Sequence, residues 1–229
     1  MIKNYLEKIF KELYIFHNLY IKNKVYLKRK FYSQSKEDIF VLKFFKFKTK
    51  GLYVDVGCHH PSRINNTFLL YKHGWRGINI DMSKISIELF NRVRAKDTNI
   101  HSAISCKNKI INYYTNKELF LSASLIQKKG NEKFKLVKKI KSQTLTQVLD
   151  KSKYKNSKID FLSIDAEGAD YDVLKSLNFK RYKPRIICIE IWKEQIKDSN
   201  IKDCKIYKFL TKKNYKLVKK LADNYIFSF

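Results

Sequence analysis

Short apolar runs alternate along the chain with segments whose apolar residues recur at helical spacing. The runs at residues 52–56, 77–80, 159–164 and 185–189 are rich in β-branched residues and have the length of buried strands. Strands that alternate with helices build a mostly parallel sheet covered on both faces, so the pattern predicts an α/β fold. Further strands are expected at residues 100–104, 110–114, 216–219 and 225–229, and helices near 65–72, 85–93, 144–150, 171–177 and 204–210.

The first 31 residues predict an amphipathic helix. Regular charges interrupt this segment, so it lacks the apolar core of a signal peptide. We expect a helical extension over residues 1–31 and one domain over residues 32–229. No apolar run approaches the roughly 20 residues that span a bilayer. The four cysteines show no C-x-x-C pairing, which is typical of reduced thiols, so we expect a cytoplasmic protein. The apolar positions at helical spacing are Ile2, Leu6, Ile9, Phe10 and Leu13.

The chain is strongly basic: 49 Lys and Arg against 21 Asp and Glu give its 229 residues a formal charge of +28. Such an excess attracts anions, among them nucleic acid, anionic membranes and the phosphates of nucleotide sugars. It is densest at residues 107–158, which hold 14 basic and 3 acidic residues. An excess of Lys over Arg, with many Asn and Ile, is also typical of an A/T-rich genome. Neither an arginine-rich arm nor zinc-finger spacing accompanies the charge, so we expect no nucleic-acid partner.

Glycine or an acidic residue follows four of the predicted strands. In an open α/β sheet, ligands bind beyond the carboxyl ends of the strands. These residues would therefore meet in one crevice, although each carboxylate alone could simply cap the next helix. The four residues are Gly57, Asp81, Asp165 and Glu190.

The turn after the first strand, "VDVGCHHP", contains one glycine where a dinucleotide site has three. A cofactor without phosphates needs only the tight turn at Gly57. Asp55 would orient the loop or meet an ammonium group, and Asp81 would accept hydrogen bonds from two ribose hydroxyls. S-adenosylmethionine has an ammonium group, a ribose and no phosphate, so it fits this turn better than NAD does.

Several blocks of the sequence, in order, resemble the FkbM-type S-adenosylmethionine-dependent methyltransferases. The blocks are "YSQSKED", "YVDVGCHHPSRINNT", "YKHGWRGINID", "FLSIDAEGADYDVLKSLNF" and "PRIICIE". The resemblance implies a Rossmann-like class I methyltransferase fold with a mostly parallel seven-stranded sheet. It also implies O-methylation of a hydroxyl, often on a sugar or a polyketide, and is typical of bacterial enzymes of capsule or lipopolysaccharide synthesis. The segment "LSASLI" at residues 121–126 departs from the pattern of the family.

Two catalytic schemes follow from the strand-end residues. In one, His60 takes the proton of the acceptor hydroxyl, because a neutral imidazole accepts protons near pH 7; His59 is then structural or faces solvent. In the other, Asp165 and Glu190 hold Mg²⁺ or Mn²⁺, which lowers the pKa of the hydroxyl. Glu167 or His60 would complete that metal site. Asp165 could instead contact the acceptor or the methyl-bearing end of the cofactor.

Smaller predictions concern the rest of the pocket. Ser33 and Gln34 could close over the cofactor, and Met82 and Ala103 could border its adenine. Helix capping is the alternative for Ser33 and for the substrate-side pair of Asn66 and Thr67, and Glu167 is a further substrate-side candidate. The expected acceptor is a sugar hydroxyl, for example on a nucleotide-activated sugar. The alternative is a nucleic-acid-binding protein or methyltransferase that uses the basic surface; the oligomeric state stays open.

Overall fold

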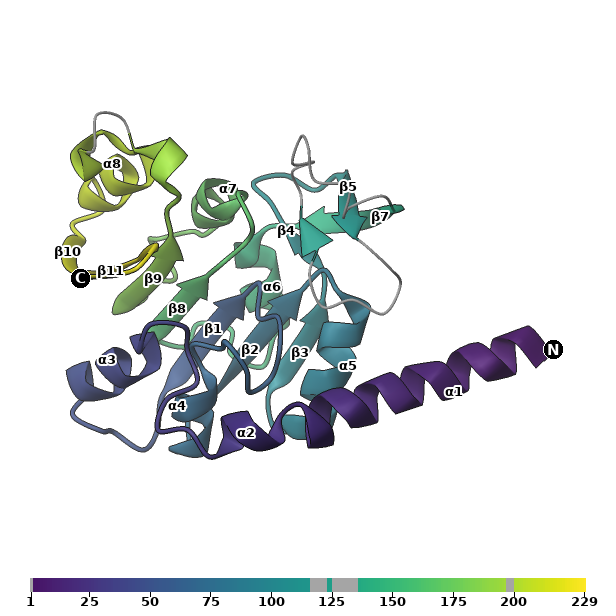
Figure 1. The fold of residues 1–229 in the computed structure, drawn as a ribbon. Helices are drawn as coiled ribbons and strands as arrows, with labels where there is room; N and C mark the ends of the chain where they lie inside the picture. Colours follow the sequence, from purple (N-terminus) through teal and green to yellow (C-terminus); the bar gives the residue numbers. More distant parts are fainter. Residues whose placement is uncertain (1, 116–122, 125–135, 197–199) are drawn as a thin grey trace.

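A seven-stranded sheet forms the centre of the computed structural model, which describes residues 2–115, 123–124, 136–196 and 200–229 (Figure 1). Its order is β10-β11-β9-β8-β1-β2-β3, and only β11 runs antiparallel to its neighbours. The predicted α/β fold with a mostly parallel sheet is therefore confirmed. The strands are β1 (Leu52–Val56), β2 (Arg76–Asp81), β3 (Thr98–His101), β8 (Phe161–Ile164), β9 (Ile186–Glu190), β10 (Lys216–Leu221) and β11 (Asn224–Ser228).

Helices cover both faces of this sheet. Alternate residues of β1 point to opposite faces, so Val54 belongs to the core cluster that includes residues of α6, α7 and α8, while Tyr53 belongs to the cluster that includes residues of α3 and α4. Continuous apolar runs are expected for strands that are buried on both sides, which explains why these strands could be read from the sequence. The helices are α3 (Glu37–Phe44), α4 (Phe68–Lys72), α5 (Lys84–Val93), α6 (Leu145–Lys151), α7 (Asp170–Lys175) and α8 (Lys205–Thr211).

A second sheet differs from the prediction. It has the order β4-β7-β5-β6 and lies near the carboxyl ends of the central strands (Figure 1). The strand predicted at residues 100–104 is in fact two strands in two sheets, because the chain leaves the central sheet at Ser102. The lysine-rich β7 was not predicted. The strands are β4 (Ala103–Ile104), β5 (Ile110–Thr115), β6 (Ala123–Ser124) and β7 (Leu136–Gln143).

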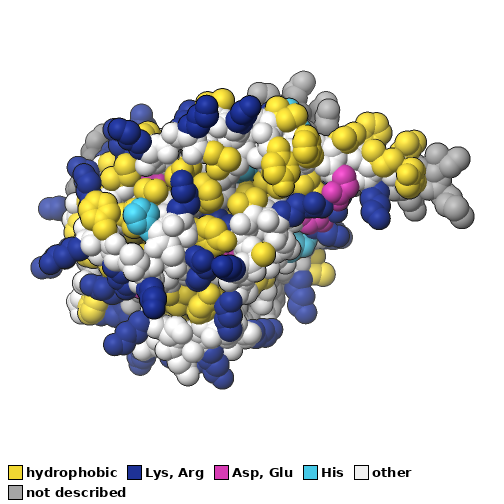
Figure 2. All heavy atoms as spheres, turned by 90° about the horizontal axis from the view of Figure 1, so that it is seen from below, with side chains coloured by type: hydrophobic (Ala, Val, Ile, Leu, Met, Phe, Trp, Pro, Cys, Tyr) yellow, Lys and Arg dark blue, Asp and Glu magenta, His cyan; other side chains and the backbone are white. Residues whose placement is uncertain are grey.

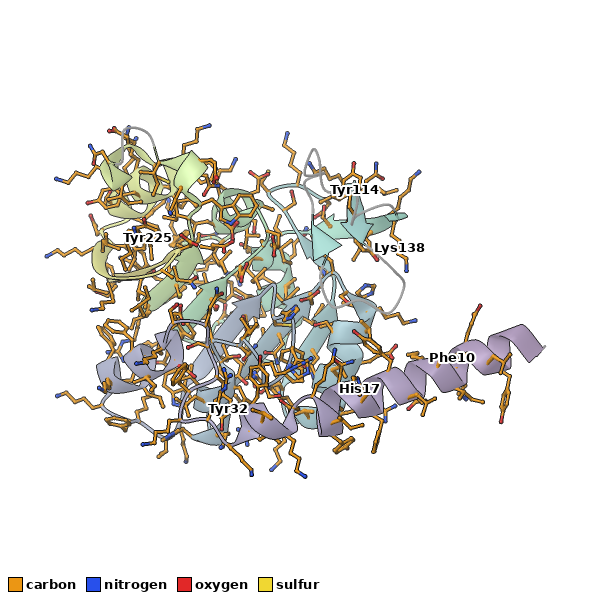
Figure 3. All side chains as sticks on the ribbon, viewed as in Figure 1. Phe10, His17, Tyr32, Tyr114, Lys138 and Tyr225 are labelled. Atoms are coloured by element: carbon orange, nitrogen blue, oxygen red, sulfur yellow. The ribbon has the colours of Figure 1, made fainter. Side chains whose placement is uncertain are left out.

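The start of the chain forms a long helix that extends past the sheet (Figures 1 and 3). Helix α1 (Ile2–Phe16) continues through the π-helical turn η1 (His17–Ile21) into α2 (Lys24–Leu27). It packs on α5 through Ile15 and Leu19, which contact Ile85 and Leu89. Among the residues that the structure describes, no helix has the length and apolar character needed to cross a membrane.

Candidate functional site

A pocket opens beyond the carboxyl ends of β1, β2, β8 and β9. It encloses about 980 Å³, including the part that is open to solvent. The strand order reverses between β1 and β8, and a crevice at such a reversal is where α/β sheets bind ligands. The predicted site residues that line it are Gln34, Gly57, Asp81, Met82, Asp165, Glu167 and Glu190.

Gly57 closes the first strand in a conformation that favours glycine, with φ of +78°. A Cβ atom at this position would lie 1.7 Å from the backbone oxygen of Asp165. The residue is therefore glycine because two strand-end loops touch there. Its backbone also borders the pocket, as predicted.

Asp81 ends β2 and shapes the turn beside it. Its carboxylate accepts hydrogen bonds from the backbone N–H groups of His59 (2.8 Å) and Ser83 (2.7 Å). Burial raises the pKa of Asp81 to about 6. The carboxylate thus joins the loops after β1 and β2 at the pocket wall.

Asp165 and Glu190 end neighbouring strands, and Glu167 follows on the β8 loop. Burial and the nearby charge of Glu190 raise the pKa of Asp165 well above its ordinary value. Burial also raises the pKa of Glu190, whose carboxylate accepts a 2.6 Å hydrogen bond from Trp192 Nε1. Three carboxylates in one pocket favour a cationic ligand or a proton-accepting role.

Three of the four expected metal ligands, Asp165, Glu167 and Glu190, line the same pocket. Within the described part of the chain, no group of three or more His, Cys, Asp and Glu side chains is arranged to hold a metal ion. His60 does not line the pocket and so cannot complete a site with Asp165 and Glu190. Glu167, the other residue expected to complete the site, does line the pocket, so the requirement for a divalent cation stays a prediction.

The positions of the two histidines are the reverse of those expected: His59 lines the pocket and His60 does not. His60 is fully buried, and its Nδ1 accepts hydrogen bonds from the backbone N–H groups of Ser62 and Arg63. Burial and the charge of Arg63 lower the pKa of His60 to about 2, so it is a poor proton acceptor near pH 7. The structure therefore does not support His60 as the base, since the pocket lining does not include it. His59, expected to be structural or to face solvent, lines the pocket.

Asp55 lies behind the pocket wall in a buried polar network. It accepts hydrogen bonds from Thr67 Oγ1 (2.8 Å) and Asn65 Nδ2 (3.2 Å). The guanidinium of Arg94, which is fully buried, donates to Thr67 and Asn65. Of the two roles foreseen for Asp55, the structure supports orientation of the loop, and it places Thr67 in the same network. Sequence analysis did not identify Arg94.

Three other predicted site residues, Ser33, Ala103 and Asn66, lie outside the pocket lining. Ser33 is buried, donates to Asp38 and does not line the pocket, whereas Gln34 beside it does. Ala103 is buried, and its neighbour Ser102 lines the pocket instead. Asn66 donates to Ser163 Oγ at 3.0 Å, away from the lining. Most of residues 121–126 lie outside the described residues.

Pocket-lining residues that were not predicted come from two sources. His59 is brought in by its left-handed backbone conformation, with φ of +54°, which no residue pattern signals. Ser102 is brought in by the break between β3 and β4. The apolar members could have been inferred as neighbours of the strand-end residues. All the unpredicted lining residues are Val56, His59, Ile64, Ile80, Ser102, Ile104, Ala166 and Val173.

A model of the FkbM methyltransferase domain matches residues 55–217, which is more than half of the chain and includes most of the pocket. The chain belongs to the FkbM methyltransferase family. The family assignment made from the sequence motifs is thus confirmed, and it supports a methyltransferase. A comparison with curated proteins found no match.

Proposed function

We propose that this FkbM-family protein transfers a methyl group from S-adenosylmethionine to a sugar hydroxyl, with the central sheet as a Rossmann-like class I methyltransferase fold. The observation that carries the proposal is the acidic lining of the pocket. Four carboxylates border it, and among the described residues no Lys or Arg does, although the chain holds 49 of them. Such a pocket favours a ligand that carries positive charge, as the sulfonium and ammonium groups of the cofactor do.

The cofactor would lie across the strand-end loops after β1 and β2. Gly57 lets the backbone turn sharply there, and Asp81 lies where the ribose hydroxyls would donate to it. Met82 would pack on the adenine through its thioether, and Gln34 would approach from the opposite side of the pocket. When bound, the cofactor supplies the electrophilic methyl group.

Asp165 is the proposed base. The hydroxyl of the acceptor must lose its proton as its oxygen attacks the methyl carbon and the bond from that carbon to sulfur breaks. A carboxylate with a raised pKa accepts that proton more readily than an ordinary one does, and the sulfonium charge favours its ionised form. Glu190 and Glu167 would hold neighbouring hydroxyls of the sugar by accepting their hydrogen bonds.

The acceptor class follows from the same charges. Phosphates would be repelled from the carboxylate-lined pocket, so a nucleotide-activated sugar would insert its sugar and leave its diphosphate at the basic outer surface. A capsule or lipopolysaccharide precursor has this form. A nucleic-acid substrate fits less well, because its backbone phosphates would have to approach Asp165 and Glu190.

The cofactor half of the proposal is tested by calorimetry with S-adenosylmethionine. Asp81→Ala should weaken binding by about 1.5–3 kcal/mol, the range for a lost hydrogen bond to a charged group. Asp172→Ala is the control, because Asp172 is a partly exposed residue of α7 that pairs with Lys175 outside the pocket lining. Unchanged affinity in Asp81→Ala would reject the role of Asp81, and tighter binding of NAD would reject the cofactor.

The acceptor half is tested by mass spectrometry. The protein is incubated with isotope-labelled S-adenosylmethionine and a panel of sugars, nucleotide sugars and single-stranded RNA. A labelled methyl ether on a sugar is the expected product. If only the RNA carries the labelled methyl group, the sugar acceptor is wrong and the nucleic-acid methyltransferase replaces it.

A further inference from the structure

The chain's first helix carries a row of apolar side chains on its outer side. We name this row the apolar stripe; it continues from α1 through η1 into α2. Its members are between 46% and 68% exposed, apart from Ile9 at 38%. Large apolar side chains that adjoin one another in water usually mark an interaction surface. The apolar stripe consists of Tyr5, Leu6, Ile9, Phe10, Leu13, Phe16, Tyr20, Ile21, Val25 and Leu27.

The stripe is not the side of α1 that holds it to the protein. Ile15 and Leu19 are buried against α5, and the same side forms ion pairs from Lys11 to Glu88 and from Glu12 to Arg92. Because successive helical residues are about 100° apart, Leu13 and its apolar neighbours fall opposite Ile15. Helix α1 therefore has two apolar sides, one packed on α5 and one exposed to water.

Basic side chains accompany the exposed side. Residues 1–31 contain eight Lys and Arg and two Glu. Five of the basic residues are exposed and cluster around α2, where they adjoin the apolar stripe. Figure 2 shows this face, with hydrophobic side chains along α1, Lys and Arg spread over the whole face, and Asp and Glu visible beside α1. The five are Lys22, Lys24, Lys28, Arg29 and Lys30.

We propose that the apolar stripe and the basic residues around α2 dock the protein on an anionic lipid bilayer, with α1 lying flat in the interface. An interfacial helix inserts its apolar side among the acyl chains while Lys and Arg contact acidic headgroups. Charge decides between this occupant and a second copy of the chain. Two molecules of this protein, each with a formal charge of +28, repel each other, whereas an anionic bilayer attracts each of them. The pocket lies beyond the carboxyl ends of β1, β2, β8 and β9, whereas α1 and α2 lie toward the other end of these strands (Figure 1).

The test is sedimentation with vesicles made of equal parts phosphatidylcholine and phosphatidylglycerol, and with pure phosphatidylcholine vesicles. The protein should sediment with the anionic vesicles and remain in solution with the neutral ones. Phe10→Glu combined with Leu13→Glu should weaken binding about tenfold or more, because two charges enter the acyl region. Ile110→Glu with Val218→Glu is the matched control, since these side chains are 71% and 40% exposed elsewhere.

A second pair of variants separates charge from apolar contact. Lys24→Glu with Lys28→Glu should also weaken binding about tenfold or more, since each Lys near an acidic surface contributes roughly fivefold. Lys151→Glu with Lys216→Glu makes the same charge change away from the stripe and should retain most of the binding. Circular dichroism confirms that each variant is folded.

Three results would overturn the proposal. The first is failure of the unmodified protein to sediment with anionic vesicles. The second is equal loss of binding in a test pair and its control. The third is a concentration-dependent dimer that Phe10→Glu with Leu13→Glu abolishes, because a second copy would then cover the stripe. Cofactor affinity should be the same in all these variants, so the result does not depend on the proposed function.

Discussion

The pocket and the apolar stripe are opposite cases. The pocket buries carboxyl groups, whereas the apolar stripe exposes large apolar side chains to water. The pocket holds Asp81 and Asp165 where burial raises their pKa values. The stripe holds Phe10 and Leu13 in water at 62% and 58% exposure. The rest of the protein follows the usual rule, with apolar cores on both faces of the sheet and Lys on the outside.

In both regions, a complementary ligand would relieve the unfavourable surroundings of these side chains. Neutral or partly charged carboxyl groups become ordinary carboxylates beside a cation, and apolar side chains leave water when a bilayer accepts them. Local departures from the rules of stability are expected at functional sites for this reason. The following changes act on one region and leave the other as a reference.

The largest effect is expected from Asp165→Asn. If Asp165 accepts the proton of the hydroxyl, the variant should lose about 10²–10⁴-fold in kcat. Cofactor affinity should change much less, which calorimetry can check. In the unmodified enzyme, the rate should fall as the pH drops through the raised pKa of Asp165, because the base becomes protonated.

Asp172→Asn serves as the control for this change, since Asp172 lies on α7 outside the pocket lining. EDTA should change the rate little. A rate that EDTA abolishes and Mg²⁺ restores would instead assign the step to a metal ion.

The next effect is a dependence of stability on pH. The pKa of Asp81 rises from 3.8 in the unfolded chain to about 6 in the folded protein, so the folded state binds more protons between these values. The contribution of Asp81 to the free energy of unfolding therefore decreases as the pH rises through this window. The total decrease is about 3 kcal/mol, at 1.36 kcal/mol per pKa unit. The Asp81→Asn variant should not show this pH-dependent decrease in the free energy of unfolding.

Urea unfolding of the unmodified protein and of Asp81→Asn at pH 4 and pH 7.5, without cofactor, measures the difference. Parallel stability curves for the two proteins would show that the Asp81 carboxyl is ionised as easily in the folded state as in the unfolded chain.

His60→Ala should affect stability rather than chemistry. Its removal leaves the backbone N–H groups of Ser62 and Arg63 without their acceptor, at a cost of about 1–3 kcal/mol in the free energy of unfolding. The turnover number at a temperature where the variant is folded should stay within about tenfold. A loss comparable to that of Asp165→Asn would restore His60 as the base.

The smallest effect is expected in the apolar stripe. Leu13→Ala should change the free energy of unfolding by less than about 0.5 kcal/mol, because the side chain is exposed in the folded protein. Ile15→Ala, two positions later, removes a buried contact with α5 and should cost about 2 kcal/mol or more. Chemical unfolding followed by circular dichroism compares the two. Equal costs would mean that the stripe is covered within the protein.

The central strands could be predicted because each is buried on both faces and so reads as an apolar run. The carboxylates of the pocket could be predicted for a related reason. Parallel strands end at one edge of the sheet, which brings Asp81, Asp165 and Glu190 together whatever the loops between them do.

The placement of the histidines could not be predicted. It depends on the left-handed conformation of His59 and on the hydrogen bond from its N–H to Asp81, so it is decided by contacts between loops. Ser102 lines the pocket in place of the predicted Ala103 for a similar reason, because the break between two sheets changes which residue faces the pocket. Strand β7 was missed because its lysines hide the alternating pattern.

The position of β11 has a consequence for synthesis on the ribosome. This strand, Asn224–Ser228, lies between β9 and β10 and pairs with both. Until residues 224–228 have left the exit tunnel, the edge of β9 has no partner, and its exposed backbone can pair with other nascent chains. The edge of β9, the strand that carries Glu190, therefore gains this partner only after residues 191–228 have been synthesised, and a chaperone that shields the edge until then would reduce such pairing.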